Sequence, residues 1–384
     1  MRRRPLSPRP RSAPILVTRP SLPPFEEYAR HLRRIWKSRY LTNGGPYLKT
    51  LEQELVRYLP ASNVAVVANG TLALQLALHS VSRKKGVVIT TPFTFAATTT
   101  SLVWEGFTPR FADIDPETFN LDPDSVADRF DDDVVGVLSV HVFGNPAGAR
   151  GVAGVAKEHN RWMIFDAAPS LGVRTQGRSL YELGDASTLS FHAVKTFHTF
   201  EGGAITTSSR RIAEQVRRLR NFGFEASGEV GTPDVAAPGI NAKMSEAHAA
   251  MGVTNLRYVD GWIRARQERY ELYRELLEPM GRVGFQHVVA CRYNFGYMPI
   301  LLSSRRTRDR VCQDLQQHGI WPRRYFFPPT SQFTFLRKTT RAPCPVAKNV
   351  ADRVLTLPLY PDLPLEQVRR IAEYIRRAVH SVVA

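Results

Sequence analysis

The chain has 384 residues, of which 43% are hydrophobic and 23% are charged, and this composition excludes global disorder. It has no run of eighteen apolar residues and no apolar block after its basic start, so we expect a cytoplasmic protein with no membrane span and no secretory signal. The net charge of +17 at pH 7 is spread over many segments, partly interleaved with acids, which disfavours nucleic-acid binding.

The first 22 residues contain six arginines, several prolines and no acid. We predict that residues 1–22 form a flexible basic tail. The three cysteines, Cys291, Cys312 and Cys344, are widely separated, so we expect neither a disulfide framework nor a paired metal site.

From Val64 onward, short apolar runs alternate with stretches that have helical periodicity. The runs lack polar alternation, which is typical of strands buried on both faces of a parallel sheet. The predicted strands are residues 64–68, 86–90, 110–114, 134–143, 162–166, 188–192 and 203–207. We therefore predict a large α/β domain over residues 23–255, with helices on both faces of a mainly parallel sheet.

The pattern changes after Asn255. A long heptad-like helix is predicted over residues 258–280, followed by short mixed elements and a closing amphipathic helix over residues 365–383. These features predict a smaller α+β domain over residues 256–384, with the long helix as the connection.

The first candidate site is "ANGTLALQLAL", Ala68 to Leu78, where a buried strand turns into an apolar helix. The free N–H groups at such a helix start suit a phosphate, which Gly70 and Thr71 would contact. A simpler interpretation is that Thr71 only caps the helix, and the stretch alone does not decide between them.

The second candidate is Asp166, at the end of the predicted strand 162–166. Ligands of parallel sheets bind at this edge, although a helix cap for the next segment explains an aspartate equally well. If a pyridine ring lay above it, an ionised Asp166 would keep the ring nitrogen protonated and let the ring act as an electron sink.

The third candidate is "SFHAVKTFHTFEGGA", Ser190 to Ala204. A metal site is disfavoured, since His192 and His198 are six residues apart with no cysteine or acid cluster to complete it. Lys195 follows a strand in an apolar setting, so desolvation would disfavour its ammonium form and prepare it as a Schiff-base nucleophile. Read alone, a lysine in such a turn is more often an exposed surface residue, and the stretch by itself does not decide between the two. Ser190 offers a hydroxyl to an anion, and Glu201-Gly202-Gly203 supplies a turn that the backbone can approach closely.

These three sites follow successive strands in the order of a phosphate turn, a ring-nitrogen acid and a Schiff-base lysine. That order matches pyridoxal phosphate. From about Leu41 to the C-terminus, the chain resembles the DegT/DnrJ/EryC1/StrS aminotransferases, on the stretches "NGTLALQLAL", "TPFTFAATTTSLVWEGFTPRFADID", "VHVFG", "FDAAPSLG", "LSFHAVKTFHTFEGGAI", "RNFGF" and "GINAKMSEAHAAMG". "FHTFEGGA", "NFGF" and "NAKMSE" are similar to the branch of VioA-like C-4 transaminases that make dTDP-4-amino-4,6-dideoxy-D-glucose.

This resemblance implies the fold of a fold-type I aminotransferase dependent on pyridoxal 5'-phosphate. It implies that Lys195 binds the cofactor covalently and shuttles protons, and that Asp166 pairs with the pyridine nitrogen. Phe95 occupies the position of the aromatic side chain that stacks on the cofactor ring.

The resemblance also assigns the phosphate site. Gly70, Thr71 and Ser190 would bind the phosphate, and Asn241 would complete the site from the neighbouring subunit of a homodimer. One departure is Pro169, which stands where many relatives carry a glutamine or histidine that contacts the ring hydroxyl.

The reaction that the resemblance implies is amino transfer from L-glutamate to the C-4 ketone of a dTDP-sugar. Arg323, Arg324 and Tyr325 in "WPRRYFFPP" are candidates for binding the nucleotide-sugar diphosphate and its sugar or base, ahead of Lys243 and His192. Two alternatives stay open: a C-3 sugar or aminocyclitol aminotransferase of the same family, and a cofactor-binding regulator that uses its basic tail on nucleic acid.

Overall fold

Seven strands form the central sheet, in the order β2-β8-β7-β6-β5-β3-β4. The computed structural model describes residues 13–82, 84–177, 179–225, 234–290, 292–336 and 343–381. The strands are β2 (Asn63–Val67), β3 (Val87–Thr90), β4 (Thr108–Phe111), β5 (Val134–Val140), β6 (Trp162–Asp166), β7 (Ala186–Ser190) and β8 (Gly203–Thr207). Each of the seven predicted strands is therefore confirmed.

The sheet is parallel except at β8, which runs antiparallel to both β2 and β7. Gly203 at the start of β8 pairs with Val67 on one side and with Ser190 on the other. The carboxyl ends of β2 and β7 therefore lie at the same edge of the sheet. Asp166, the last residue of β6, lies at this edge too, since it pairs with Thr188.

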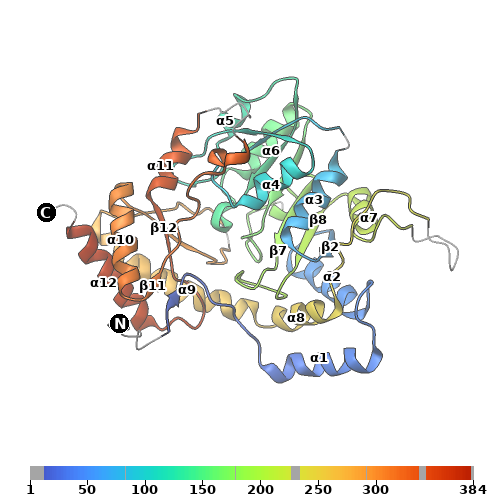
Figure 1. Ribbon diagram of the computed structural model, residues 1–384, viewed down its shortest axis with the longest axis horizontal. Coiled ribbons are helices and arrows are strands. Elements are labelled where there is room, and N and C mark those ends of the chain that lie inside the picture. The colour runs from blue at the N-terminus through green and yellow to red at the C-terminus, as the bar shows by residue number, and fades with distance from the viewer. Residues whose placement is uncertain are drawn as a thin grey trace, which may run out of the picture.

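Helices cover both faces of the sheet (Figure 1). On one face, α4 (Ala96–Trp104) and α7 (Arg210–Leu219) both pack against α3 (Gly70–Val81). On the opposite face lie α2 (Pro46–Tyr58), α6 (Ala149–Glu158) and α8 (Glu246–Leu256). In β2, Val64 and Val66 belong to one core while Ala65 and Val67 belong to another, which explains why the strand has no polar alternation.

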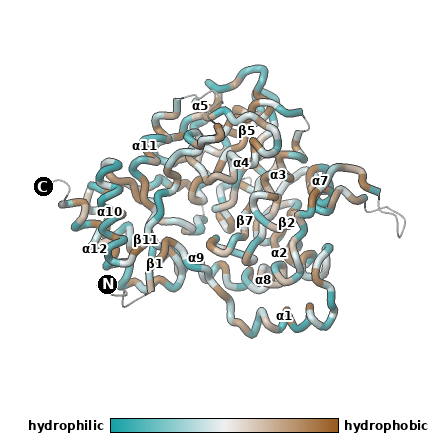
Figure 2. Tube along the Cα trace, in the orientation of Figure 1, coloured by the Kyte–Doolittle hydropathy of each residue, from teal (hydrophilic) through white to brown (hydrophobic). Residues whose placement is uncertain are grey.

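A second sheet consists of β9 (Gly284–Phe285), β10 (Met298–Leu301) and β12 (Val354–Leu357). It is accompanied by α10 (Arg305–Gln317), α11 (Pro345–Arg353) and α12 (Leu365–Ser381). The long helix α9 (Val259–Leu277) and α12 confirm the two helices that the sequence predicts in this half of the chain. Hydropathy follows the same plan, with hydrophobic strands inside and hydrophilic helix surfaces outside (Figure 2).

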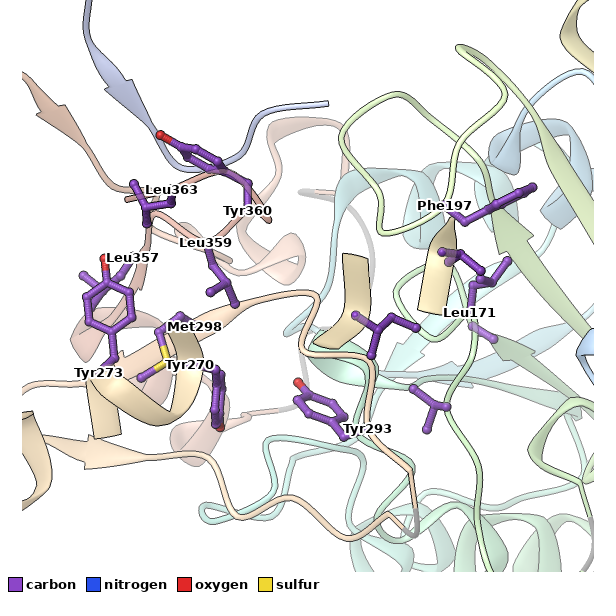
Figure 3. Packing of buried hydrophobic residues seen from close by; sticks show 14 of the residues in the cluster. Leu171, Phe197, Tyr270, Tyr273, Tyr293, Met298, Leu357, Leu359, Tyr360 and Leu363 are labelled. Atoms are coloured by element: carbon purple, nitrogen blue, oxygen red, sulfur yellow. The ribbon is translucent and has the colours of Figure 1, made fainter. Parts of the chain in front are cut away.

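One hydrophobic core joins the two sheets. It contains Tyr273 and Met298 beside the small sheet, and Leu171 and Phe197 beside the large one (Figure 3). The predicted domain boundary between residues 255 and 256 stays a prediction. Cys312 is buried and Cys344 is half-buried, while Cys291 lies outside the described residues.

The prediction of a flexible tail over residues 1–22 is wrong for its second half. Residues 1–12 lie outside the described residues, but β1 (Ile15–Leu16) pairs in parallel with β11 (Ile320–Trp321). Val17 is buried, and its carbonyl oxygen accepts a hydrogen bond from the N–H of Leu359 at 3.0 Å. After this segment comes α1 (Phe25–Ser38), which packs on α8. None of the helices in the described residues is long and apolar enough to span a membrane.

Candidate active site

Lys195 lies in the loop that connects β7 to β8. Its N–H donates to the carbonyl oxygen of His192 at 2.9 Å, which closes a turn and leaves the side chain half-buried. The Nζ atom donates a hydrogen bond to the phenol oxygen of Tyr297 at 3.0 Å. Tyr297 immediately precedes β10, so the small sheet supplies the lysine's partner.

The expected destabilisation of the Lys195 ammonium form is not what the structure shows. Burial does lower the pKa of Lys195, but the interaction with Tyr297, the hydrogen bond to it and the nearby Asp166 carboxylate together raise the pKa above its usual value. Without a ligand, Lys195 is therefore an ammonium group at neutral pH. The sequence-based expectation failed because the apolar neighbours along the chain are not the groups that face Nζ.

Asp166 is buried, and both of its carboxylate oxygens accept hydrogen bonds. Thr98 Oγ1 donates to Oδ2 at 2.7 Å and the N–H of Ala168 donates to Oδ1 at 3.1 Å. The pKa of Asp166 is raised, because burial outweighs these two hydrogen bonds and the charge of Lys195. A protonated ring nitrogen beside it would favour the carboxylate. Residues 167–173 form turns rather than a helix, so Asp166 does not serve as a helix cap.

The predicted phosphate turn lies next to the lysine loop. Asn69 caps α3, since its Oδ1 accepts from the N–H of Leu72 at 2.9 Å, and the alternative in which Thr71 caps the helix is therefore wrong. The N–H groups of Gly70 and Thr71 precede the first intrahelical hydrogen bond and suit an anion.

Close packing explains why glycines are needed at this turn. A Cβ atom on Gly70 would lie 2.9 Å from Cβ of Ser190, and one on Gly203 would lie 2.6 Å from the carbonyl oxygen of Asn69. The turn of Gly70, the hydroxyl of Ser190 and the start of β8 are therefore side by side, as the phosphate prediction requires.

Phe95 lies at the N-cap position of α4 and is 62% exposed, which is unusual for a large apolar side chain. Its carbonyl oxygen accepts from the N–H of Thr98 at 3.2 Å. Because Thr98 binds the Asp166 carboxylate, the same turn of backbone connects the exposed ring to the ring-nitrogen acid. This position is compatible with the stacking that the sequence predicts for Phe95, which stays a prediction.

Asn241 is exposed, and its Oδ1 accepts from Lys243 Nζ at 2.7 Å. The carbonyl oxygen of the next residue, Ala242, accepts a hydrogen bond from the N–H of Ala68 at 2.9 Å. The backbone at Asn241 therefore lies beside the phosphate turn of its own chain. The role predicted for it across a subunit boundary stays a prediction.

The stretch 323–325 reaches the same site through Tyr325. The ring of Tyr325 lies edge-on to that of Tyr297, with centroids 6.2 Å apart. The two arginines differ: Arg324 forms an ion pair with Asp309 at 3.5 Å, whereas Arg323 is exposed and has no ion pair within the described part of the chain. Of the two, Arg323 is the one free to reach a phosphate.

The histidines of the lysine loop have different environments. His192 is exposed and lies 3.5 Å from a Glu201 carboxylate oxygen, so it is not packed inside the strand predicted over residues 188–192. His198 is fully buried, and both of its ring nitrogens bond backbone atoms: Nε2 is 2.6 Å from the carbonyl oxygen of Ser21, and Nδ1 accepts from the N–H of Phe200 at 3.2 Å.

Pro169 has no side-chain donor for the cofactor ring hydroxyl, and the side chain of its neighbour Asn294 does not replace one. Asn294 uses its amide nitrogen on the carbonyl oxygens of Pro169 and Leu171, at 2.8 and 2.9 Å, and its Oδ1 accepts from the N–H of Gly296 at 3.1 Å. Asn294, Gly296 and Tyr297 line a cavity together with Lys195 and Ser190.

Sequence reasoning missed two residues of the site, Thr98 and Tyr297. Thr98 lies in "TPFTFAATTT" and is one of several threonines there, with nothing to single it out. Tyr297 is 102 positions from Lys195, beyond the reach of any local pattern.

The comparisons with known proteins agree with this geometry. The model of the DegT/DnrJ/EryC1/StrS aminotransferase family matches residues 25–376. A dTDP-4-amino-4,6-dideoxy-D-glucose transaminase from Shigella dysenteriae is 37% identical over 94% of this chain and 98% of its own length. The crystal structure of DesI in the presence of its TDP-sugar product superposes with a TM-score of 0.89 at 36% identity, covering 96% of this chain and 94% of that one. A Bacillus cereus protein described as a PLP-dependent aminotransferase has a TM-score of 0.87 at 28% identity, covering 94% of this chain and all of that one.

Proposed function

The chain belongs to the DegT/DnrJ/EryC1/StrS aminotransferase family, and from this premise we propose that it aminates the C-4 ketone of dTDP-4-dehydro-6-deoxy-D-glucose. L-Glutamate is the amino donor, and the products are dTDP-4-amino-4,6-dideoxy-D-glucose and 2-oxoglutarate. The observation that carries the proposal is that Lys195, Asp166 and the Gly70 turn converge at one sheet edge in a chain whose relatives include the Shigella transaminase.

Pyridoxal 5'-phosphate is the cofactor, and when bound it supplies an electron sink for the carbon that gains or loses the amine. The residues fit its chemistry. The amides of Gly70 and Thr71 and the hydroxyl of Ser190 would hold the phosphate, and the buried Asp166 carboxylate would hold the ring nitrogen. The exposed ring of Phe95 would cover one face of the cofactor.

Lys195 has two tasks in this reaction. Its amine first has to lose a proton in order to act as a nucleophile, and the phenol oxygen of Tyr297, 3.0 Å from Nζ, is the group in place to receive its hydrogen bond. Later the free amine of Lys195 would accept the proton from the α-carbon of glutamate and donate a proton to C-4 of the sugar, and positioned proton transfer of this kind contributes about 10² to 10⁴ in rate.

For the nucleotide-sugar, Arg323 is the cation available to the diphosphate, and Tyr325 packs beside the sugar or base. Arg324 holds Asp309 and thereby keeps the stretch 323–325 against α10. The active enzyme is a homodimer in which Asn241 completes the phosphate site of the neighbouring subunit.

The decisive experiment supplies the purified protein, loaded with pyridoxal phosphate, with dTDP-4-dehydro-6-deoxy-D-glucose and L-glutamate. We expect an aminated dTDP-sugar whose NMR spectrum places nitrogen on C-4, and equimolar 2-oxoglutarate. Amination at C-3, or no aminated nucleotide-sugar, would show that the assignment is wrong. Borohydride reduction should attach the cofactor to Lys195, and peptide mass spectrometry identifies the modified residue.

A further inference from the structure

Residues 13–24 cross from the small-sheet side of the molecule to the lysine loop, and we call this segment the strap (Figure 1). At its first end, the N–H of Ile15 donates to the carbonyl oxygen of Gly319 at 2.9 Å, and β1 pairs with β11. Arg323 follows β11 after a single residue. The strap is therefore joined to the stretch that carries the candidate substrate-binding residues.

The middle of the strap is fixed to the chain that follows β12. The Val17 carbonyl oxygen accepts from the N–H of Leu359, and Arg19 forms an ion pair with Asp362 at 3.0 Å. Because both side chains of the Arg19–Asp362 ion pair are exposed, the pair contributes little stability by itself. The backbone hydrogen bond at Val17 is buried with its residue and holds the path of the strap.

The second end of the strap is held by His198, three residues after Lys195. The N–H of Phe200 donates to Nδ1, which makes Nδ1 the acceptor and leaves the proton on Nε2, so Nε2 donates to the Ser21 carbonyl oxygen at 2.6 Å. The amide nitrogen of Asn255 donates to the His198 carbonyl oxygen at 2.8 Å, which fixes the backbone as well. Burial lowers the pKa of His198, so this neutral arrangement persists at neutral pH.

We propose that the strap sets the position of the 323–325 stretch relative to Lys195, and that His198 is the positioning residue that fastens the strap to the lysine loop. The kinetic consequence rests on the proposed function, because it concerns binding of the nucleotide-sugar. The positional claim does not, because it concerns only contacts within this chain. A displacement of about 1 Å between a binding group and a reacting group can cost about a hundredfold in rate, so such a fastening matters for turnover.

Two substitutions separate the strap contact from the local turn. His198→Asn keeps an acceptor where Nδ1 lies and loses the donor to Ser21, whereas His198→Gln keeps a donor where Nε2 lies and loses the acceptor for Phe200. Two deletions form a second matched pair that leaves His198 intact. Removal of residues 2–22 takes away β1 and Ser21, and removal of residues 2–12 leaves every strap contact in place.

The first measurement is amide hydrogen exchange of the full-length protein without substrate. We expect peptides covering residues 196–202 and 320–325 to exchange at least about fivefold faster in His198→Asn and in the 2–22 deletion. In His198→Gln and in the 2–12 deletion, residues 320–325 should exchange as in the wild type. Unchanged exchange at 320–325 in both His198→Asn and the 2–22 deletion would overturn the proposal.

The second measurement divides the reaction into halves. We expect His198→Asn to lower kcat/KM for the nucleotide-sugar by about tenfold, and to change the glutamate half-reaction by less than about threefold. His198→Gln should restore most of the loss. Equal losses in the two substitutions would assign the effect to loss of the imidazole ring itself, a loss confined to His198→Gln would assign it to the Phe200 turn, and either result would contradict the role of the strap. A wild-type protein that does not aminate the sugar refutes the proposed function, while the exchange data still decide on the strap.

Discussion

Lys195 lies between two walls of different origin. The wall from the seven-stranded sheet is polar and contains Asp166, Thr98 and Ser190, all at or beside the carboxyl ends of strands. The wall from the small-sheet side is aromatic and contains Tyr297 and Tyr325. The polar wall holds the groups that the cofactor would need, whereas the aromatic wall holds the phenol bonded to Lys195 and, in the proposed function, the residues that meet the substrate.

The largest effect is expected where the two walls meet. Lys195→Ala should lower turnover by about 10⁴-fold, the upper end of what positioned proton transfer contributes, and should leave the fold unchanged because the side chain is only half-buried. Single-turnover assays with glutamate and circular dichroism provide the two measurements. If Lys195→Ala kept a tenth of the wild-type rate, Lys195 would not be the group that transfers the proton.

The two walls also differ in how far the sequence predicts them. The seven strands and the order of Gly70, Asp166 and Lys195 could be predicted, because buried strands leave apolar runs and ligand residues follow directly after them. β1 could not, because a strand of two residues carries no periodicity. β1 is instead held in place by β11 and Leu359, which are more than 300 positions away in the sequence.

The electrostatics of Lys195 illustrate the same limit. Phe191, Ala193 and Val194 surround the lysine along the chain and suggest desolvation, which does occur. The opposing contribution comes from Tyr297, which packs there through tertiary structure alone. A local sequence can therefore indicate that a group is buried without indicating the sign of its pKa shift.

The second prediction tests the aromatic wall directly. Tyr297→Phe removes the phenol that makes the largest contribution raising the pKa of Lys195, while the lowering effect of burial stays, so the lysine pKa falls. We expect about tenfold lower turnover at neutral pH. We also expect the pH profile for attachment of pyridoxal phosphate to the apoprotein, measured by borohydride trapping, to move to lower pH. Tyr325→Phe is the matched control, since Tyr325 raises the pKa of Lys195 less than Tyr297 does and no hydrogen bond joins it to Lys195 within the described residues. A shift of the same size there would contradict the assignment to Tyr297.

A third prediction separates the two arginines on the small-sheet side. Arg323→Ala should raise KM for the nucleotide-sugar by about tenfold or more, the effect of losing one charge-assisted hydrogen bond to phosphate. Arg324→Ala should raise it by less than about threefold, because Arg324 is already paired with Asp309. Steady-state kinetics at fixed glutamate measure both values. The reverse order would show that the diphosphate binds on the Asp309 side of this stretch.

The smallest effect concerns stability rather than turnover, and it tests the support of the polar wall. His141 follows β5, and its ring stacks on that of Phe165 with centroids 4.8 Å apart. The backbone N–H of His141 donates to the carbonyl oxygen of Asp166 at 3.1 Å. The ring is buried and its Nε2 has no hydrogen-bond partner among the described residues, so burial lowers the pKa of His141 to about 4.

Because an unfolded histidine titrates near pH 6.5, the unfolded chain binds a proton that the folded chain does not as the pH falls below that value. His141 should therefore cost stability progressively between pH 6.5 and 4, by up to about 3 kcal/mol at the acid end. His141→Phe keeps the stacking on Phe165 and removes the titrating group, so urea unfolding should show a smaller loss of stability over this range than in the wild type. Other buried histidines, such as His198, titrate in both proteins and cancel in the difference. Parallel stability curves for the two proteins would mean that His141 takes up a proton in the folded state, and that the base of the polar wall is more open to water than its burial indicates.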